Sequence, residues 1–360
     1  MKRLFHILCV LFLLFACDNK NSYKIKGTLS NLSDATLYVA FESPEKTVID
    51  SVTCNPEGKF LIYHEQDTEV QTITFFYNDR EHWFTVYPEA RKAIQVKGDA
   101  DYPLMLQIKG GRINHKLTQF KKKVAPFLKQ LTDLQRNNLE NASITGDETM
   151  QLLNLRHEIQ KAAQDFIAKN PKEEASAVLI YDHFTNPIII EKTEQLLDLL
   201  SGELDDFFLV KTIRKELEKA KTTRIGAKTP DFHVTTVNGH TITVDSLKNK
   251  YFILAFTALW CEMCQTDVMI LDELAAKYAK DTLEIIVVSL DNELDKIRET
   301  ILHDSVRWNV VVDSAGQAIR LFEAYNVKSL PKCFLMDKEG IILLNTKNGE
   351  ELRQMVGDLF

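Results

Sequence analysis

The chain has 360 residues, of which 45% are hydrophobic and 26% are charged, and its formal net charge is −7. These proportions are typical of a globular protein, and the length indicates two or three domains rather than one. The basic run Lys121–Lys123 is too short to form the basic stripe of a nucleic-acid-binding protein, so we expect no nucleic-acid partner.

The first 16 residues have the pattern of an export signal. Lys2 and Arg3 precede an apolar stretch over residues 4–15, which is too short to span a membrane comfortably. The stretch ends in Leu-Phe-Ala-Cys, which resembles a bacterial lipobox with Cys17 as the lipidated residue. That resemblance implies a lipidated tether over residues 17–22 and attachment to a membrane of the cell envelope, facing the periplasm. A plain cleaved signal or an uncleaved anchor is the alternative.

Residues 23–111 alternate between hydrophobic and polar side chains in short segments, which predicts strands. Turn signals such as Asn55-Pro56 and Glu57-Gly58 separate the segments. The expected strands cover residues 23–27, 36–41, 59–63, 72–77, 83–87 and 93–96. Several short strands at this spacing indicate a small β sandwich or barrel, and no catalytic group of residues stands out in it.

Residues 112–222 show hydrophobic residues at helical spacing instead. The expected helices run from Ile113 past Leu131 and over residues 150–167, 173–183, 193–200 and 204–221. Pro126 is a candidate for a kink in the first helix, and residues 138–147 are expected to form a loop. This helical region contains no Gly-rich phosphate loop and no metal-ligand spacing. We expect it to be a spacer beside the C-terminal domain, or a surface for substrate docking or dimerisation.

Residues 223–360 combine strands and helices, which predicts an α/β domain. Asn238-Gly239 lies between two short alternating segments and is a strong hairpin signal. The expected strands cover 251–256, 283–289, 308–313, 333–336 and 341–344, and the expected helices cover 261–280, 293–302, 315–325 and 350–360. The chain is therefore predicted to be multidomain, with an all-β domain, a helical middle region and a C-terminal α/β domain.

Two cysteines lie where the apolar strand 251–256 turns into a helix, in the sequence Trp-Cys-Glu-Met-Cys that ends at Cys264. Unpaired N–H groups and the macrodipole at a helix N-terminus favour a thiolate, which is the nucleophile in disulfide exchange. Glu262 opposes thiolate formation through its like charge. We therefore expect Cys261 to attack a disulfide and Cys264, one turn later, to resolve the mixed disulfide by forming a Cys261–Cys264 bond.

Four segments resemble the thioredoxin superfamily, and more closely its membrane-anchored TlpA/ResA-like branch of thiol-disulfide oxidoreductases. They are residues 226–232, Asn238-Gly239, Trp260–Cys264 and Leu330-Pro331. The resemblance covers roughly the last 138 residues and implies a thioredoxin fold that works without a cofactor. It implies a substrate groove at Trp260, Glu262, Met263, Leu330 and Pro331, with Pro331 in the cis form. Residues 23–111 resemble the β domain of unknown function that precedes such modules in some envelope lipoproteins.

The sequence departs from this pattern at two acids. Ordinary thioredoxins carry a buried acid six residues before the first cysteine, where this chain has Ala255. The TlpA/ResA-like branch tends to have a glutamate three residues after the second cysteine, where this chain has Asp267. The resemblance implies that Asp267 carries protons for the exchange. Alternatively, Asp267 is a first-turn acid that complements the helix dipole.

Two further cysteines, Cys54 and Cys333, lie outside the leader and the redox motif. Cys54 lies in a turn-like segment, residues 53–58, and is expected to be a surface or half-buried thiol. Cys333, two residues after Pro331 on an apolar strand, is either a small buried hydrophobe or a third thiol near the redox pair. A single Cys-x-x-Cys without a second pair at ligand spacing argues against a metal site.

The expected function is that of an envelope-anchored thiol-disulfide oxidoreductase that reduces or exchanges disulfides of exported proteins. Such an enzyme needs an unidentified membrane redox partner, in addition to the membrane contact through Cys17. One alternative is a peroxidase of the peroxiredoxin type, although the sequence lacks a Pro-x-x-x-Thr-x-x-Cys motif. The other alternative is a structural or binding lipoprotein with an inactive redox domain.

Overall fold

A computed structural model describes residues 21–78, 81–89, 92–141, 146–291, 296–297 and 308–360. The chain divides into two compact units, each treated separately below. The first comprises the chain up to Pro187 together with Lys192–Lys211, and the second comprises Ile188–Glu191 together with Thr212–Phe360. The predicted signal over residues 1–16 and the predicted lipidation residue Cys17 lie outside the described residues.

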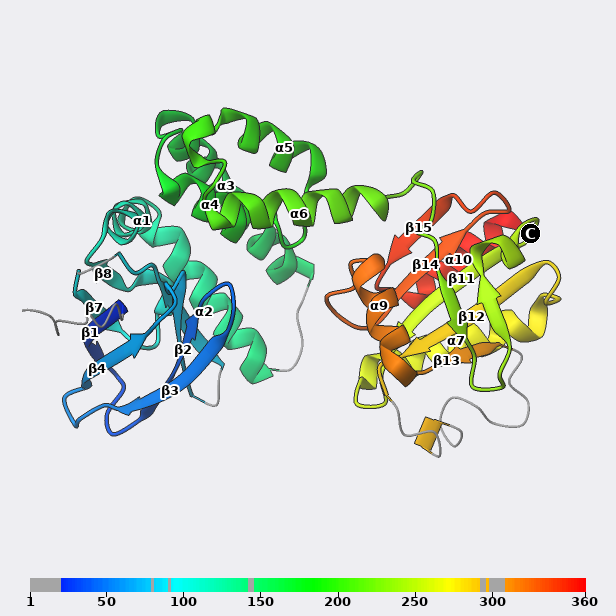
Figure 1. Cartoon of the computed structure of the whole chain (residues 1–360), viewed down its shortest axis with the longest axis horizontal. Coiled ribbons are helices and arrows are strands. Elements are labelled where there is room, and N and C mark those ends of the chain that lie inside the picture. Colours follow the sequence, from blue (N-terminus) through cyan, green and yellow to red (C-terminus); the bar gives the residue numbers. More distant parts are fainter. Residues whose placement is uncertain (1–20, 79–80, 90–91, 142–145, 292–295, 298–307) are drawn as a thin grey trace, which may run out of the picture. The chain divides into compact units, whose positions relative to one another are not determined.

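The first unit contains a sandwich of two four-stranded sheets, in the strand orders β4-β1-β7-β8 and β3-β2-β5-β6 (Figure 1). The strands are β1 (Asn21–Ser30), β2 (Thr36–Glu42), β3 (Thr47–Thr53), β4 (Lys59–Gln66), β5 (Thr72–Tyr77), β6 (His82–Val86), β7 (Ile94–Asp99) and β8 (Gln107–Lys109). Alternate side chains of both sheets point inward and form one hydrophobic core, which confirms the predicted β-rich region.

Two strands were not predicted, and both lie at the edge of a sheet. β3 has no fully buried residue, so its sequence lacks the alternation that marks a strand. β8 has only three residues. Edge strands pair on one side only, and their sequences therefore carry weaker patterns than central strands.

The prediction for Cys54 was wrong, because its side chain is buried with 1% exposure. The residue follows β3, its N–H donates to the carbonyl of Ala35 at 2.9 Å, and its thiol packs into the sandwich core. Burial raises the pKa of the Cys54 thiol, so the group is not a reactive thiolate. Residues 55–57 of the polar turn after it are exposed, whereas Cys54 is not.

Helices follow the sandwich, as predicted. They are α1 (Arg112–Lys123), α2 (Ala125–Asn141), α3 (Gly146–Lys169), α4 (Glu174–Phe184), α5 (Ile190–Leu199) and α6 (Phe208–Thr222). The break between α1 and α2 falls at Val124, and Pro126 lies in the first turn of α2, where its missing N–H costs nothing. The loop predicted over 138–147 is too long, because α2 continues to Asn141 and α3 begins at Gly146. Polar residues without glycine or proline do not stop a helix.

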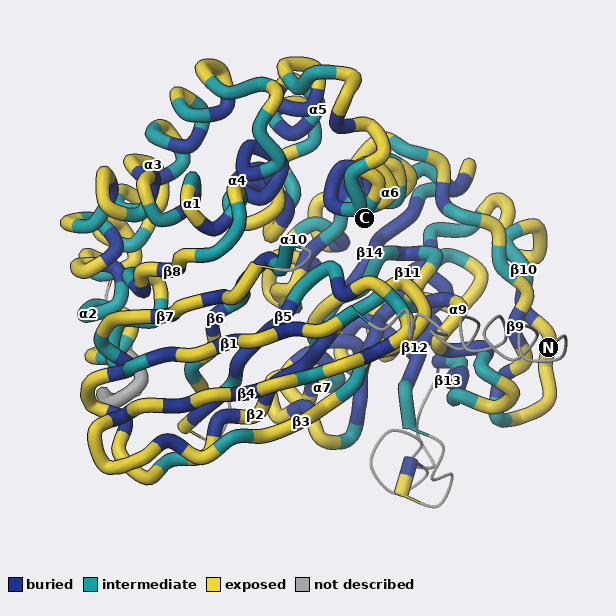
Figure 2. The backbone as a smooth tube through the Cα atoms, turned by 60° about the vertical axis from the view of Figure 1, so that its left-hand side comes forward, coloured by how far each residue is buried: buried dark blue, intermediate teal, exposed yellow. Residues whose placement is uncertain are grey.

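The second unit is built on a five-stranded sheet in the order β13-β12-β11-β14-β15. β11 (Tyr251–Thr257), β12 (Leu283–Ser289) and β13 (Asn309–Val311) are parallel, whereas β14 (Lys332–Met336) and β15 (Ile342–Thr346) form an antiparallel pair beside β11. The central strand β11 and its parallel neighbour β12 are buried along nearly their whole length (Figure 2). This arrangement confirms the predicted thioredoxin-like α/β domain.

Helices cover both faces of this sheet. α7 (Glu262–Lys277) and α10 (Gly349–Leu359) share a hydrophobic core with one face, and α9 (Gln317–Ala324) shares a core with the other. The hairpin of β9 (His233–Thr235) and β10 (Thr241–Thr243) packs on the α9 side. The helix predicted over residues 293–302 lies outside the described residues except at 296–297.

Candidate active site

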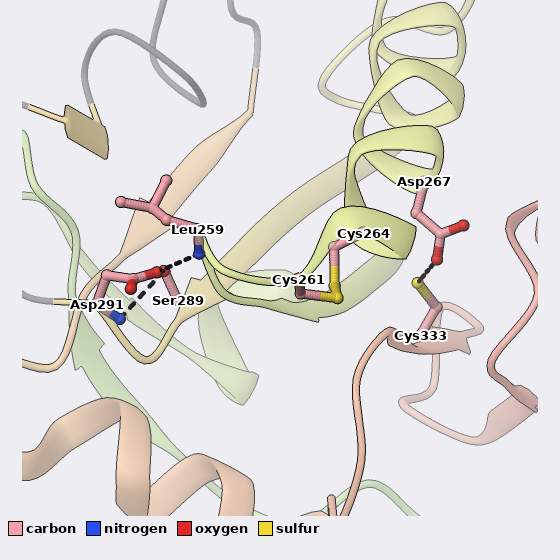
Figure 3. Close-up of a disulfide and its surroundings, with 7 residues drawn as sticks. All are labelled: Leu259, Cys261, Cys264, Asp267, Ser289, Asp291 and Cys333. Atoms are coloured by element: carbon pink, nitrogen blue, oxygen red, sulfur yellow. Dashed lines mark hydrogen bonds between the residues drawn. A yellow bond between two sulfur atoms is a disulfide. The ribbon is translucent and has the colours of Figure 1, made fainter.

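The redox motif lies in the turn between β11 and α7 (Figure 3). The N–H of Cys261 donates to the carbonyl of Ala258 at 3.0 Å, which closes a tight turn directly after the buried strand. Cys261 is the N-cap residue of α7, and its backbone is extended. The chain therefore places Cys261 at the positive end of the helix dipole, where a thiolate is stabilised.

Cys261 and Cys264 are joined by a disulfide whose Cα atoms lie 5.3 Å apart. The two side chains differ in exposure, with 8% for Cys261 and 2% for Cys264. Cys261 is therefore slightly more accessible to another molecule than Cys264 is. The division into an attacking and a resolving thiol stays a prediction.

The residues predicted to shape a groove fall into an exposed and a packed set. Trp260 and Met263 are each 71% exposed, although both are large and apolar, and Glu262 between them is also exposed. Leu330 packs against the small cluster formed by Ala258 and the two cysteines. Pro331 is buried, and the bond that precedes it is cis. The cysteine motif thus carries two exposed apolar side chains, and the disulfide itself packs against Leu330.

Asp267 lies one helical turn after Cys264 and is only 9% exposed. Burial raises the pKa of its carboxyl group, and a hydrogen bond from the N–H of Gly349 partly offsets that rise. The thiol of Cys333 on β14 donates to Asp267 Oδ2 with an S···O distance of 4.0 Å (Figure 3). The structure therefore brings together Asp267 and Cys333, which the sequence placed 66 positions apart.

One residue at the site was missed in the sequence. Asp291 follows β12, and its Oδ2 accepts hydrogen bonds from the N–H of Leu259 and from the hydroxyl of Ser289, both at 2.7 Å. Leu259 is two residues before Cys261, so Asp291 fixes the turn that carries the motif. The sequence did contain a signal for this contact, which is the Ser-Leu-Asp that ends a buried parallel strand. Neighbouring parallel strands end at the same edge of the sheet, so polar side chains there lie near the cysteine motif.

The structure also bears on metal binding and on membrane spans. Across the described ranges, no group of three or more His, Cys, Asp or Glu side chains is arranged to hold a metal ion. None of the helices in the described part of the chain is both long and apolar enough to cross a membrane.

Comparison with known proteins finds matches for two parts of the chain. Residues 225–344 match the AhpC/TSA family, and residues 23–117 match a domain of unknown function, DUF4369. Residues 225–344 form a thioredoxin-like AhpC/TSA domain. The thiol-disulfide oxidoreductase ResA of Bacillus thuringiensis subsp. konkukian is 29% identical to the chain over 138 residues, which are 38% of this chain and 78% of ResA. ResA of Bacillus anthracis is 29% identical over 164 residues, or 46% of this chain and 91% of that protein.

Among solved structures, the thioredoxin domain of a thiol-disulfide oxidoreductase from Bacteroides vulgatus is similar to this chain. Its sequence identity is 22% and its TM-score is 0.35, over 38% of this chain and 97% of that domain. A thioredoxin-like protein from Bacteroides caccae, at 19% identity and a TM-score of 0.41, covers 59% of this chain and 82% of its own.

The family matches and the similar proteins confirm the predicted family resemblance and the predicted enzyme class. The chain resembles ResA-like proteins in its last third and carries a DUF4369 domain before it. It is an enzyme of the thiol-disulfide oxidoreductase class.

Proposed function

We propose that the chain is an envelope-anchored oxidoreductase that reduces disulfides of exported proteins through Cys261 and Cys264. The observation that supports this proposal is the Cys261–Cys264 disulfide at the N-terminus of α7, flanked by exposed apolar side chains. A protein substrate would cover Trp260 and Met263, and burial of these side chains would hold it while sulfur exchange occurs.

The exchange follows from the positions of the two sulfurs. In the reduced enzyme, the Cys261 thiolate attacks one sulfur of a substrate disulfide, and the other substrate sulfur leaves as a thiolate that takes up a proton. Cys264 then bonds to Cys261 while the bond between Cys261 and the substrate breaks. Two electrons pass from the enzyme dithiol to the substrate, which becomes two thiols. A dithiol on a membrane redox partner would supply two electrons to reduce the Cys261–Cys264 disulfide again.

The second step requires that Cys264 lose its proton. We propose that Asp267 accepts it, because this acid is buried in the same helix one turn away. A carboxyl group whose pKa is raised by burial exchanges a proton with a thiol more readily than an ordinary aspartate does. Asp267 would then return the proton to the departing substrate thiolate.

Redox titration tests the function directly. The full-length protein in detergent, equilibrated with defined thiol buffers, should show one reversible two-electron couple assigned to Cys261 and Cys264. A reduction potential near or below about −270 mV supports a reductase, whereas a value toward about −120 mV indicates an oxidant or isomerase. If the pair does not cycle reversibly at any buffer potential, the chain is not an exchange enzyme and the binding-lipoprotein alternative gains support.

The proposal of membrane attachment depends on the export signal over residues 1–16 and on lipidation of Cys17. Cells that express the chain should incorporate labelled fatty acid into it, and the protein should sediment with membranes, because two or more acyl chains give stable attachment. Cys17→Ala should lose the label and most of the membrane-bound fraction, while Cys54→Ala should keep both. Equal labelling of the wild type and Cys17→Ala would refute the lipoprotein assignment.

A further inference from the structure

Cys333 has a position that the exchange mechanism does not yet use. It lies on β14 opposite Ala255 of β11 and is 1% exposed, on the face of the sheet that packs against α7 and α10. Burial, with the nearby Asp267 carboxylate, raises the pKa of its thiol well above the ordinary range. Cys333 therefore keeps its proton at any pH at which the enzyme works, and it is a permanent hydrogen-bond donor.

The Asp267 carboxylate, which accepts the hydrogen bond of Cys333, is also contacted by α10. The N–H of Gly349, in the first turn of α10, also bonds to the carboxylate of Asp267. A Cβ atom at Gly349 would lie 2.5 Å from Asp267 Oδ1, which explains why this position has no side chain. Asp267 is thus confined between the thiol of β14 and the N-terminus of α10, whose dipole also favours a negative charge.

Among the other charged groups on these elements, Lys332 acts electrostatically on Cys333 and partly offsets the rise in the pKa of its thiol. On α10, the carboxylates of Glu350 and Glu351 bond to Arg353 and Thr346. On β14, the ammonium group of Lys332 lies over the ring of Phe334, at 5.4 Å from its centroid. On α7, Glu262 is exposed in the first turn. The described donors to Asp267 are therefore the Cys333 thiol and the Gly349 N–H.

We infer that Cys333 is a positioning residue for disulfide exchange: its thiol holds the Asp267 carboxylate in place and stabilises the ionised form that receives the proton of Cys264. This inference rests on the proposed function of Asp267 as a proton acceptor. Without the donor, the carboxylate loses one of its two described partners in a buried site, so its protonated form gains relative stability. The acid then accepts a proton from the solvent at a higher pH and is less available to Cys264.

The test measures the titration of Asp267 in the oxidised full-length protein, in which neither Cys261 nor Cys264 titrates. NMR of the protein with ¹³C at the side-chain carboxyl carbon of aspartate follows this titration. The resonance of Asp267 is identified as the one missing from the spectrum of Asp267→Asn. Cys333→Ala should raise the pKa of Asp267 by about one pH unit, a modest value for loss of a weak S–H donor to a charged group. Cys333→Ser keeps a donor and should titrate close to the wild type, and Cys54→Ala controls for loss of a buried thiol.

A kinetic measurement then connects the titration to exchange. The rate at which the mixed disulfide resolves should decrease as the pH is lowered. The midpoint of this decrease should lie at a higher pH in Cys333→Ala than in the wild type, by the same amount as the pKa of Asp267 rises. An unchanged pKa of Asp267 in Cys333→Ala would overturn the inference. Equal pKa shifts in Cys333→Ala and Cys333→Ser would also overturn it, because they would report altered packing and not the loss of a donor. A shifted pKa with an unmoved profile would overturn the role in exchange. The NMR titration needs no turnover, so an inactive protein would refute the proposed function without affecting this test.

Discussion

Cys261→Ser should abolish the reduction of protein disulfides, with a loss of about 1,000-fold or more in the rate at saturating dithiol. The reason is that a hydroxyl at the N-cap of α7 remains neutral at pH values where a thiol in that place becomes the nucleophile. The measurement is the reduction of insulin disulfides by dithiothreitol, followed through the turbidity of the precipitating chains.

The partner variant separates the two cysteines. Cys264→Ser keeps the attacking thiol and should accumulate a mixed disulfide with the substrate, which mass spectrometry of the quenched reaction detects. Cys54→Ser is the matched control, because that thiol is buried in the core of the other compact unit, and it should retain wild-type turnover. Turnover by Cys261→Ser at the wild-type rate would eliminate the proposed chemistry.

Phe334→Ala should lower the free energy of unfolding of the second unit by about 3–5 kcal/mol. Phe334 is fully buried in β14, and its ring lies 5.1 Å from that of Tyr325 and 6.0 Å from that of Phe256. Truncation removes the ring from the centre of this cluster and leaves a cavity that the strand cannot close. Urea unfolding monitored by tryptophan fluorescence measures the change, since Trp260 and Trp308 lie in this unit and Trp83 in the other.

The control for this variant is Phe360→Ala at the C-terminus. Phe360 is 47% exposed and contacts Tyr251 and Tyr278 at the surface, so its loss should cost under about 1.5 kcal/mol. Similar losses in the two variants would mean that the described core does not carry the stability of the unit.

The sequence predicted most reliably the elements whose patterns result directly from burial. The apolar run 251–256 became β11, and the hairpin signal Asn238-Gly239 became the turn between β9 and β10, with Gly239 at φ +78°. The two cysteines were identified because a Cys-x-x-Cys between a buried strand and a helix is typical of thiol-disulfide exchange. β3 was missed because none of its residues is fully buried, so its sequence has no alternation of hydrophobic and polar residues.

Contacts between distant segments could not be predicted in the same way. The bond between Cys333 and Asp267 depends on how β14 lies against α7, and neither residue carries a motif that names the other. The contact of Asp291 with Leu259 likewise results from two strand ends that meet at one edge of the sheet. Burial of Cys54 is a third case, since a polar turn beside it gave the opposite impression.

The contact made by Asp291 has a consequence for the redox cycle. Its carboxylate ties the turn before Cys261 to the end of β12, and neither sulfur takes part in that attachment. We therefore expect the turn to stay fastened when the disulfide breaks, with the reduced cysteines held close to the arrangement from which the bond re-forms. The two oxidation states then differ little in conformational entropy, so ordering of the loop adds little to the barrier of either half-reaction.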